Sequence, residues 1–272
     1  MLRAAVPVAF VFSGVLGVAA ADGPPGAAEL EKLGAKVTVT KGVVTQASVN
    51  TEALTPEQFR TLGAATTLKR LSTSGKGVTD QTLPLLAGLT QLEELSTDQT
   101  RLTDDGYKHF AQFKELRSLA LFHPSWDMKA FTGRGLAHLR ALPKLERLTF
   151  AGSTAGDEAL EALVQVTQLK SFSTWHTMQT QAGNAHLTKL DLTALRIGQR
   201  LPRYGTAAPP SFDESTIPTL AKMKSLERLE LFEAVLTARG LEPLKGLPNL
   251  KTLAIHTTEI PAASRSGSTS SR

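Results

Sequence analysis

Cysteine is absent from the 272-residue sequence, and this excludes disulfide bonds, thiolate metal sites and a lipid-modified cysteine. An excess of one charge sign is missing too, because 30 basic and 25 acidic residues are interspersed and leave a formal net charge of +5. This distribution argues against a nucleic-acid-binding protein, which would gather its basic residues on one face. Composition therefore indicates a mixed, solvated surface.

Long hydrophobic runs are missing except at the N-terminus. Arg3 precedes an almost unbroken apolar run over residues 4–18, and the alanines at 19–21 supply small residues for cleavage before Asp22. This order predicts a secretory signal peptide over residues 1–21. The alternative is an uncleaved membrane anchor, but the run is shorter than the ~20 residues of a comfortable span. Since export without cysteine fits a bacterial envelope protein, we expect the periplasm, the cell surface or the extracellular space, without stable membrane insertion after cleavage.

Motifs for catalysis and phosphate binding are missing as well. The sequence has no H-E-x-x-H, no nucleophile motif with its base and no carboxylate pair set by spacing. The glycine-rich turns at 75–77 and 151–156 do not have the full spacing of a phosphate-binding loop. His109, His138 and His186 share one position in three predicted helices, but packed helices lie ~8–10 Å apart, too far for common ligation of a metal. We therefore expect no metal, no cofactor and no enzyme.

What the sequence does contain is a repeat of about 24 residues. Each unit opens with L-x-x-L-x-L or a near variant; most steps are 24 residues, one is 23, one 29 and one 34. The units begin at Val44, Leu68, Leu92, Leu116, Leu145, Leu169, Leu192, Leu226 and Leu250. A repeat of this length predicts a stacked solenoid, in which each unit buries its apolar face against its neighbours.

Two periods succeed one another inside each unit. Leu116, Leu119 and Leu121 belong to an alternating segment, which predicts a short strand. Leu136, Leu139 and Leu142 recur every third residue, which predicts a helix of about two turns. A Thr-Asp-x-Gly segment between the two carries residues that cap helix starts. The strands should stack as one parallel sheet on the concave face, with the short helices on the convex face.

This pattern resembles the leucine-rich repeat family, over residues 44–260 and about nine repeats. The L-T-D-x-G-L-x-x-L-x-x-L form, at 102–113 and 236–247, is similar to the ribonuclease-inhibitor-like and F-box-associated subtype found in many exported bacterial proteins. The resemblance implies an α/β solenoid that binds a partner. Repeat six departs from the pattern, with Gln179 and Asn184 at usually apolar places.

The two ends of the chain differ from the repeats. Residues 22–43 predict a linker and an N-terminal cap, made of a short helix over 27–33 closed by Gly34 and a hairpin that turns at Lys41 and Gly42. Residues 261–272 are rich in Pro, Ala, Ser and Gly, which predicts a disordered tail.

Residues at one strand position in successive repeats become neighbours in space, since parallel strands lie ~4.8 Å apart. The second position alternates in charge and predicts a ladder of cross-strand ion pairs. Its members are Thr45, Lys69, Glu93, Arg117, Glu146, Lys170, Thr193, Glu227 and Lys251.

The seventh position gathers aromatic and imidazole groups from repeat four onward, next to two insertions near residues 123–129 and 199–211. Tryptophan and tyrosine are scarce, with two of each in the chain, and Trp126, Trp175 and Tyr204 fall in or beside this region. Interfaces are enriched in such residues, so we predict one recognition surface here. The alternative is that the insertions fold back and bury these rings as a satellite core. The predicted surface comprises Phe122, His123, Trp126, Trp175, His176, Arg200, Tyr204, Phe232 and His256.

The sequence therefore predicts a monomeric, non-catalytic module that recognises a protein partner. A carbohydrate-binding envelope protein is the second hypothesis, because Trp and Tyr beside Arg and His also suit stacking on a sugar. A third is an enzyme whose site is assembled by the two insertions.

Overall fold

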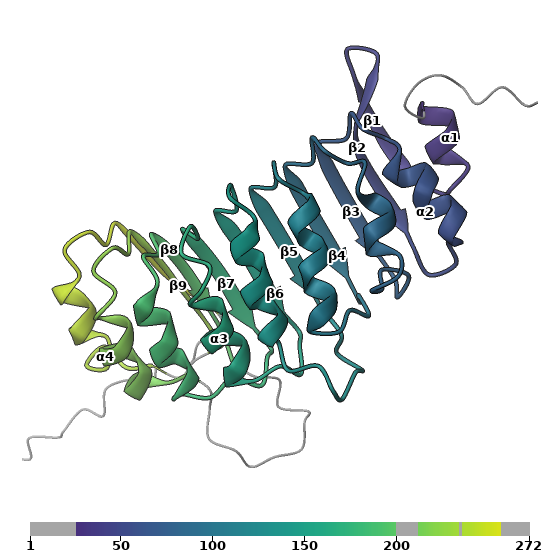
Figure 1. Ribbon diagram of the computed structural model, residues 1–272. Helices are drawn as coiled ribbons and strands as arrows, with labels where there is room; N and C mark the ends of the chain where they lie inside the picture. The colour runs from purple at the N-terminus through teal and green to yellow at the C-terminus, as the bar shows by residue number, and fades with distance from the viewer. Residues whose placement is uncertain (1–25, 200–211, 234–235, 257–272) are drawn as a thin grey trace, which may run out of the picture.

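The computed structural model describes residues 26–199, 212–233 and 236–256. One ten-stranded sheet runs through these residues in sequence order, and helices line one of its faces (Figure 1). Nine strands, β2 to β10, are parallel, one for each predicted repeat, so the α/β leucine-rich-repeat solenoid is confirmed. The strands are β1 (Lys36–Thr40), β2 (Val43–Asn50), β3 (Arg70–Ser74), β4 (Glu94–Asp98), β5 (Ser118–Phe122), β6 (Arg147–Ala151), β7 (Ser171–Trp175), β8 (Ala194–Ile197), β9 (Arg228–Phe232) and β10 (Thr252–His256).

The helices on the outer face are short, and most of them are 3₁₀ helices. A 3₁₀ helix has 3.0 residues per turn, so a leucine at every third position stays on one face. Leu136, Leu139 and Leu142 accordingly lie fully buried against the sheet. The helices are α2 (Pro56–Gly63), η1 (Leu83–Leu86), η2 (Asp105–Gln112), η3 (Arg134–Ala141), α3 (Asp157–Leu163), η4 (Gly183–Lys189), η6 (Glu214–Thr216), α4 (Ile217–Leu220) and η7 (Glu242–Gly246).

A hairpin covers the N-terminal edge of the sheet. Strand β1 pairs antiparallel with β2 through Lys41 and Gly42, whose φ angles of 52° and 82° suit a tight two-residue turn. Helix α1 (Ala27–Glu31) precedes it, and Gly34 follows with a φ of 78°. Leu30 of α1 is completely buried, so this segment closes the end of the core.

The core is a column of residues from the second inward position of each strand. Leu71, Leu95, Leu119 and Leu148 pair in register and are at most 2% exposed. At the C-terminal end the same column reaches Leu253, which is 41% exposed because no described strand lies beyond β10. The register predicted from the repeat is therefore the observed one.

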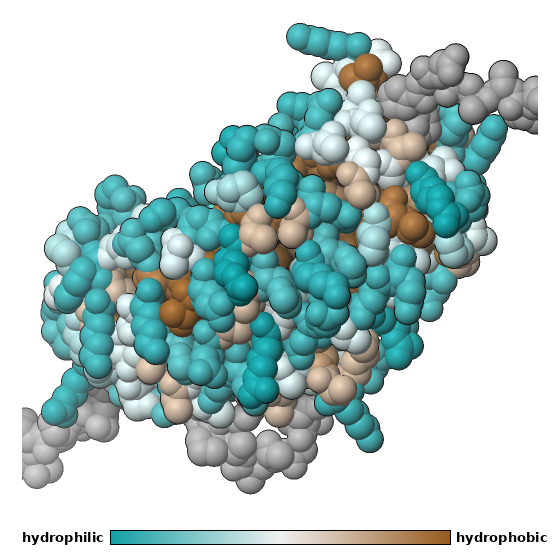
Figure 2. Space-filling view, in the orientation of Figure 1, coloured by the Kyte–Doolittle hydropathy of each residue, from teal (hydrophilic) through white to brown (hydrophobic). Residues whose placement is uncertain are grey.

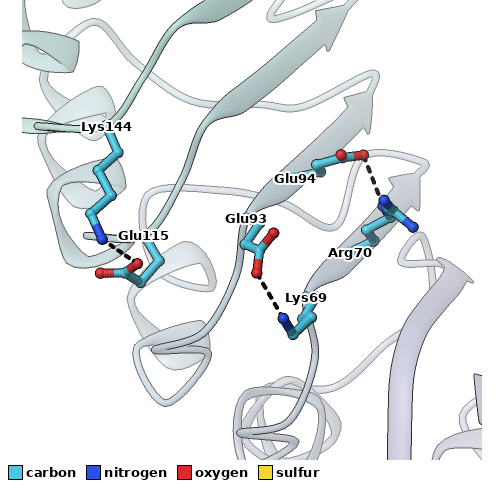
Figure 3. A network of polar contacts seen from close by, with 6 residues as sticks. All are labelled: Lys69, Arg70, Glu93, Glu94, Glu115 and Lys144. Atoms are coloured by element: carbon cyan, nitrogen blue, oxygen red, sulfur yellow. Dashed lines mark hydrogen bonds and ion pairs between the residues drawn. The ribbon is translucent and has the colours of Figure 1, made fainter. Parts of the chain in front are cut away.

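The predicted charge ladder forms in part. Lys69 pairs with Glu93 at 2.9 Å, and that hydrogen bond lowers the pKa of the glutamate. Two more rungs join members of the same column, Arg117 to Glu146 at 3.9 Å and Glu227 to Lys251 at 2.8 Å. The ladder is interrupted at Lys170, because its ammonium group instead contacts Asp191 at 2.8 Å. A second row beside it pairs Arg70 with Glu94 at 3.1 Å (Figure 3).

The Thr-Asp-x-Gly segments connect neighbouring repeats. The carboxylate of Asp80 accepts hydrogen bonds from the amide (3.0 Å) and hydroxyl (2.7 Å) of Thr103 in the next repeat. Thr103 in turn accepts from the amide of Gly106, as a helix cap does. A Cβ at Gly106 would lie 1.8 Å from an oxygen of Asp80, so the glycine permits the close approach. Asp157 and Thr180 repeat the arrangement at 2.7 and 2.6 Å.

Candidate functional site

The face of the sheet opposite the helices, here called the open face, carries the third, fifth and seventh residues of each repeat. The fifth residues form a floor of small side chains over the first six repeats, and a hollow of about 490 Å³ lies over its N-terminal half, between residues such as Ser72, Ser96 and Arg70. Two large residues, Arg196 and Glu230, interrupt this floor farther along. The fifth row is Ser48, Ser72, Ser96, Ala120, Thr149, Ser173, Arg196, Glu230 and Ala254.

The seventh row brings together the aromatic residues that the sequence predicted. Phe122, Ala151 and Trp175 are paired across β5, β6 and β7, and Phe232 and His256 across β9 and β10. The rings of Phe122 and Trp175 meet over Ala151 with centroids 6.2 Å apart. Phe232 and His256 stack at 4.5 Å with an interplanar angle of 22°. His256 is exposed, and the other three rings are partly buried. Each ring therefore keeps part of its surface accessible to solvent.

Arg196 joins these two pairs of rings. Its guanidinium carbon lies 4.8 Å from the ring centre of Trp175 and 3.9 Å from that of Phe232, which are cation–π distances. Gly198 makes room for this arrangement, since a Cβ there would lie 2.9 Å from the Cβ of Trp175 and 3.1 Å from that of Phe232. We call Phe122, Trp175, Arg196, Phe232 and His256 the aromatic strip.

Arg196 was missed by the sequence reasoning, which followed the seventh position alone. The signal was present in the fifth row, where a long cationic side chain follows six residues that are Ser, Ala or Thr. Fifth and seventh residues point to the same side of a strand. The replacement of a small residue by Arg196 in the fifth row therefore marks the repeat in which this row contacts the aromatic residues of the seventh row.

The predicted histidines lie just beyond the strip, each paired with a carboxylate. His123 Nδ1 lies 2.8 Å from Asp98, and His176 Nε2 lies 3.0 Å from Glu233, two repeats away. Both histidines and Glu233 have φ angles of 45–58°, so the residue that follows each of these strands adopts the left-handed backbone conformation. The side chain of His123 is 48% exposed, and its pair with Asp98 stands on open surface rather than in a pocket.

Trp126 has Lys76 of repeat two, and no residue of the aromatic strip, beside its ring among the described residues, so its place on the recognition surface stays a prediction. The insertion of repeat four folds toward repeats two and three: the buried Ser125 donates to the carbonyl of Leu102, and Asp127 pairs with Lys76 at 3.0 Å. The hydrogen bond from Lys76 lowers the pKa of Asp127. Trp126 remains 38% exposed, with Lys76 5.9 Å from its ring centre. The insertion is thus anchored by a serine and an aspartate, while its ring stays outside.

Repeat six, which departs from the repeat pattern, replaces apolar packing by buried polar contacts. Gln179 and Asn184 are at most 2% exposed. The carbonyl oxygen of Gln179 accepts from Thr174 at 3.2 Å and Thr177 at 3.0 Å, and its amide donates to Asn184 at 3.4 Å. This network lies directly under the strand that carries Trp175.

Other predicted features lie elsewhere. Arg200, Tyr204 and the repeat-seven insertion lie outside the described residues, as do the signal segment and the tail. Within the described ranges no three His, Asp or Glu side chains are grouped as a metal site requires. In that part of the chain, no helix has the length and apolar character needed to cross a membrane. The helical face is mostly hydrophilic, with small separate apolar patches (Figure 2).

Comparison with known proteins gives a structural likeness. The chain matches no protein-family model and no curated protein sequence. Among solved structures it is similar to an internalin (inlF) from Listeria monocytogenes, with 20% sequence identity and a TM-score of 0.48, over 87% of this chain and 68% of that one. The repeat architecture rests on the register and burial described above and not on this likeness.

Proposed function

We propose that the chain is a non-catalytic module that binds a protein partner through the aromatic strip on its open face. The observation that carries the proposal is the strip itself: five side chains from five different repeats lie in one continuous line of ring and cation–π contacts. Such a line requires strands β5 to β10 to pair in register. Each ring also remains at least partly exposed to solvent. Trp and Arg are among the residue types that contribute most binding energy at protein interfaces, where the partner covers them and removes them from water.

The length of the strip fits a protein segment. Five strand steps separate Phe122 from His256, and at ~4.8 Å per step the strip spans about 24 Å. An extended chain rises ~3.3 Å per residue, so about seven partner residues would cover it. The solenoid holds the rings on strands rather than on loops, and a rigid arrangement of this kind reduces the entropy lost on binding.

Carbohydrate binding is the weaker candidate. It was favoured by three rings. The ring of Trp126 has Lys76 5.9 Å from its centre and no contact with the aromatic strip among the described residues, and Tyr204 lies outside those residues. The remaining ring, Trp175, is in contact with Arg196 and Phe122, which occupy part of the surface on which a sugar would stack. An enzyme is weaker still, since the histidine–carboxylate pairs are open to solvent.

The partner is best sought by capture and then by substitution. The chain from Asp22 onward, immobilised, would be exposed to envelope extract and the retained proteins identified by mass. Trp175→Ala and Phe232→Ala should each weaken binding of the purified partner by ~1–3 kcal/mol. Lys69→Ala, on the charge ladder at the far end of the sheet, is the matched control and should change the Kd little. If both ring variants fold normally and bind like the parent, the strip is not the recognition surface.

We also propose that the protein is exported after cleavage of residues 1–21 and acts as a monomer. The support is the order of a basic residue, an apolar run and small residues at the N-terminus. Sequencing the N-terminus of the exported protein should give Asp22 first, and its mass in solution should be that of one chain. Recovery of an intact Met1 in the cytosol would contradict export.

A further inference from the structure

The guanidinium group of Arg196 is held between two rings, and its one ion pair in the described part of the chain, with Glu230 at 3.9 Å, is too long for a hydrogen bond. Trp175 and Phe232, on the strands at either side of β8, have their ring centres 4.8 and 3.9 Å from the guanidinium carbon. Cation–π contacts of this kind hold the group in place and do not use its N–H groups, which stay available for hydrogen bonding. The positive charge is therefore oriented by apolar neighbours in the middle of the proposed recognition surface.

The edges of the guanidinium have few acceptors. The nearest carboxylate oxygen, on Glu230, lies 3.9 Å from Nε, beyond hydrogen-bonding distance. Nε itself is shielded from solvent and has no hydrogen-bond partner within the described part of the chain. The side chain as a whole is 40% exposed. Solvent reaches the group from the open face, which is the side from which a partner would approach.

We infer that Arg196 receives a carboxylate of the protein partner, an Asp or Glu side chain or a C-terminus, next to an apolar side chain that packs on Trp175 and Phe232. This inference rests on the proposed function and specifies its chemistry. A guanidinium fork matches the two oxygens of a carboxylate, and such charge-assisted hydrogen bonds are about twice as strong as neutral ones. The flanking rings suit the apolar neighbour, since together with the arginine they form one continuous contact surface.

Glu230 should affect carboxylate binding in the direction opposite to Arg196. Its carboxylate lies on the same side of the sheet as Arg196 and opposes the approach of another negative charge. Removing the charge of Glu230 should therefore strengthen carboxylate binding, whereas removing the guanidinium of Arg196 should weaken it. General damage to the fold would weaken binding in both variants, so the two signs separate recognition from stability.

The test uses two small probes that differ only at the terminal group, N-acetylphenylalanine with a carboxylate and N-acetylphenylalaninamide with a neutral amide. The protein is the full chain with Trp126→Phe, so that Trp175 is the remaining tryptophan and its fluorescence reports binding. Ligands of this size bind at about millimolar Kd. The acid should bind about tenfold or more tightly than the amide, as a hydrogen bond to a charged group implies.

The variants then assign the preference to Arg196. Arg196→Gln should bring the acid to the affinity of the amide, and Arg196→Lys, which keeps the charge without the fork, should fall between. Glu230→Gln should raise affinity for the acid several-fold and leave the amide unchanged. Each variant must melt near the parent temperature for its Kd to count, and Arg196→Lys and Glu230→Gln are the mildest changes available.

Several results would overturn the inference. Equal binding of the two probes, or no binding of either at their solubility limit, would show that Arg196 does not receive a carboxylate. The same follows if Arg196→Gln keeps the preference. Glucuronate binding as tightly as N-acetylphenylalanine would assign the site to an acidic sugar. None of these results depends on the captured partner, so loss of binding to that partner in Trp175→Ala would still support the proposed function.

Discussion

Asp104 provides a direct test of how neighbouring repeats are held together. Its carboxylate accepts three hydrogen bonds from repeat four: from the amide of Thr132 at 3.0 Å, from the hydroxyl of Thr132 at 2.9 Å and from the amide of Gly135 at 2.9 Å. These donors start helix η3, which packs behind the strand that carries Phe122. Asp104→Ala leaves all three donors without this acceptor.

The expected loss of stability is set by those three bonds. A hydrogen bond to a charged group contributes ~1.5–3 kcal/mol when it is well shielded, and less when water can replace the acceptor. Asp104 and Thr132 are partly exposed while Gly135 is buried, so we expect Asp104→Ala to cost about 2–4 kcal/mol in total. Asp104→Asn keeps one acceptor oxygen and loses the charge, and should cost about half as much.

Asp105 is the matched control, because it is the next residue and has the same side chain. Its carboxylate is well exposed and pairs only with Lys108 on its own helix. Asp105→Ala should therefore change stability little. Urea unfolding followed by far-UV circular dichroism measures both variants, and hydrogen exchange of residues 132–142 shows whether the loss is local. Equal destabilisation by the two alanine variants would refute the inter-repeat account of the Thr-Asp-x-Gly segment.

Two further substitutions test the core and the strip. Leu119→Ala should cost ~2–5 kcal/mol, since Leu119 is 1% exposed at the centre of the leucine column, and a melting temperature within a degree or two of the parent would contradict the register. Gly198→Ala should cost ~1–3 kcal/mol, because its Cβ would lie 2.9 Å from the Cβ of Trp175, and the emission of Trp175 should shift as the ring moves. An unchanged emission spectrum in a variant that folds would mean that Trp175 is not tightly packed there.

The sequence could predict the rows of the sheet because the repeat fixes them. A parallel strand added at the start of each repeat places residues 122, 151 and 175 side by side whatever their identity, although the step is 29 residues in one case and 24 in the other. A slip of one residue would expose the leucine column and bury the charges of the neighbouring positions. For this reason the seventh row and three rungs of the charge ladder follow from counting alone.

The sequence could not predict what breaks the period. The direction of the repeat-four insertion depends on a buried hydrogen bond of Ser125 and an ion pair of Asp127 with Lys76, 51 residues earlier, and no periodicity encodes either contact. Arg196 was overlooked for a related reason: its importance comes from reaching between two residues of another row. Contacts across rows depend on side-chain length and rotamer, which a repeat alignment does not contain.

The size of the residues along the seventh row explains why the strip forms where it does. Strands lie ~4.8 Å apart, so rings on adjacent strands are close enough to contact directly, as Phe232 and His256 do by stacking at 4.5 Å. Rings on alternate strands start ~9.6 Å apart and need a small residue between them and something to fill the gap. Ala151 lets Phe122 and Trp175 tilt together to 6.2 Å, and Gly198 leaves a gap between Trp175 and Phe232 that the guanidinium of Arg196 occupies. The alternation of large and small residues along the seventh row thus gives the repeat scaffold a particular surface, and the guanidinium of Arg196 lies beside the position where Gly198 has no side chain. A partner that recognises the strip must match both the rings and that charge.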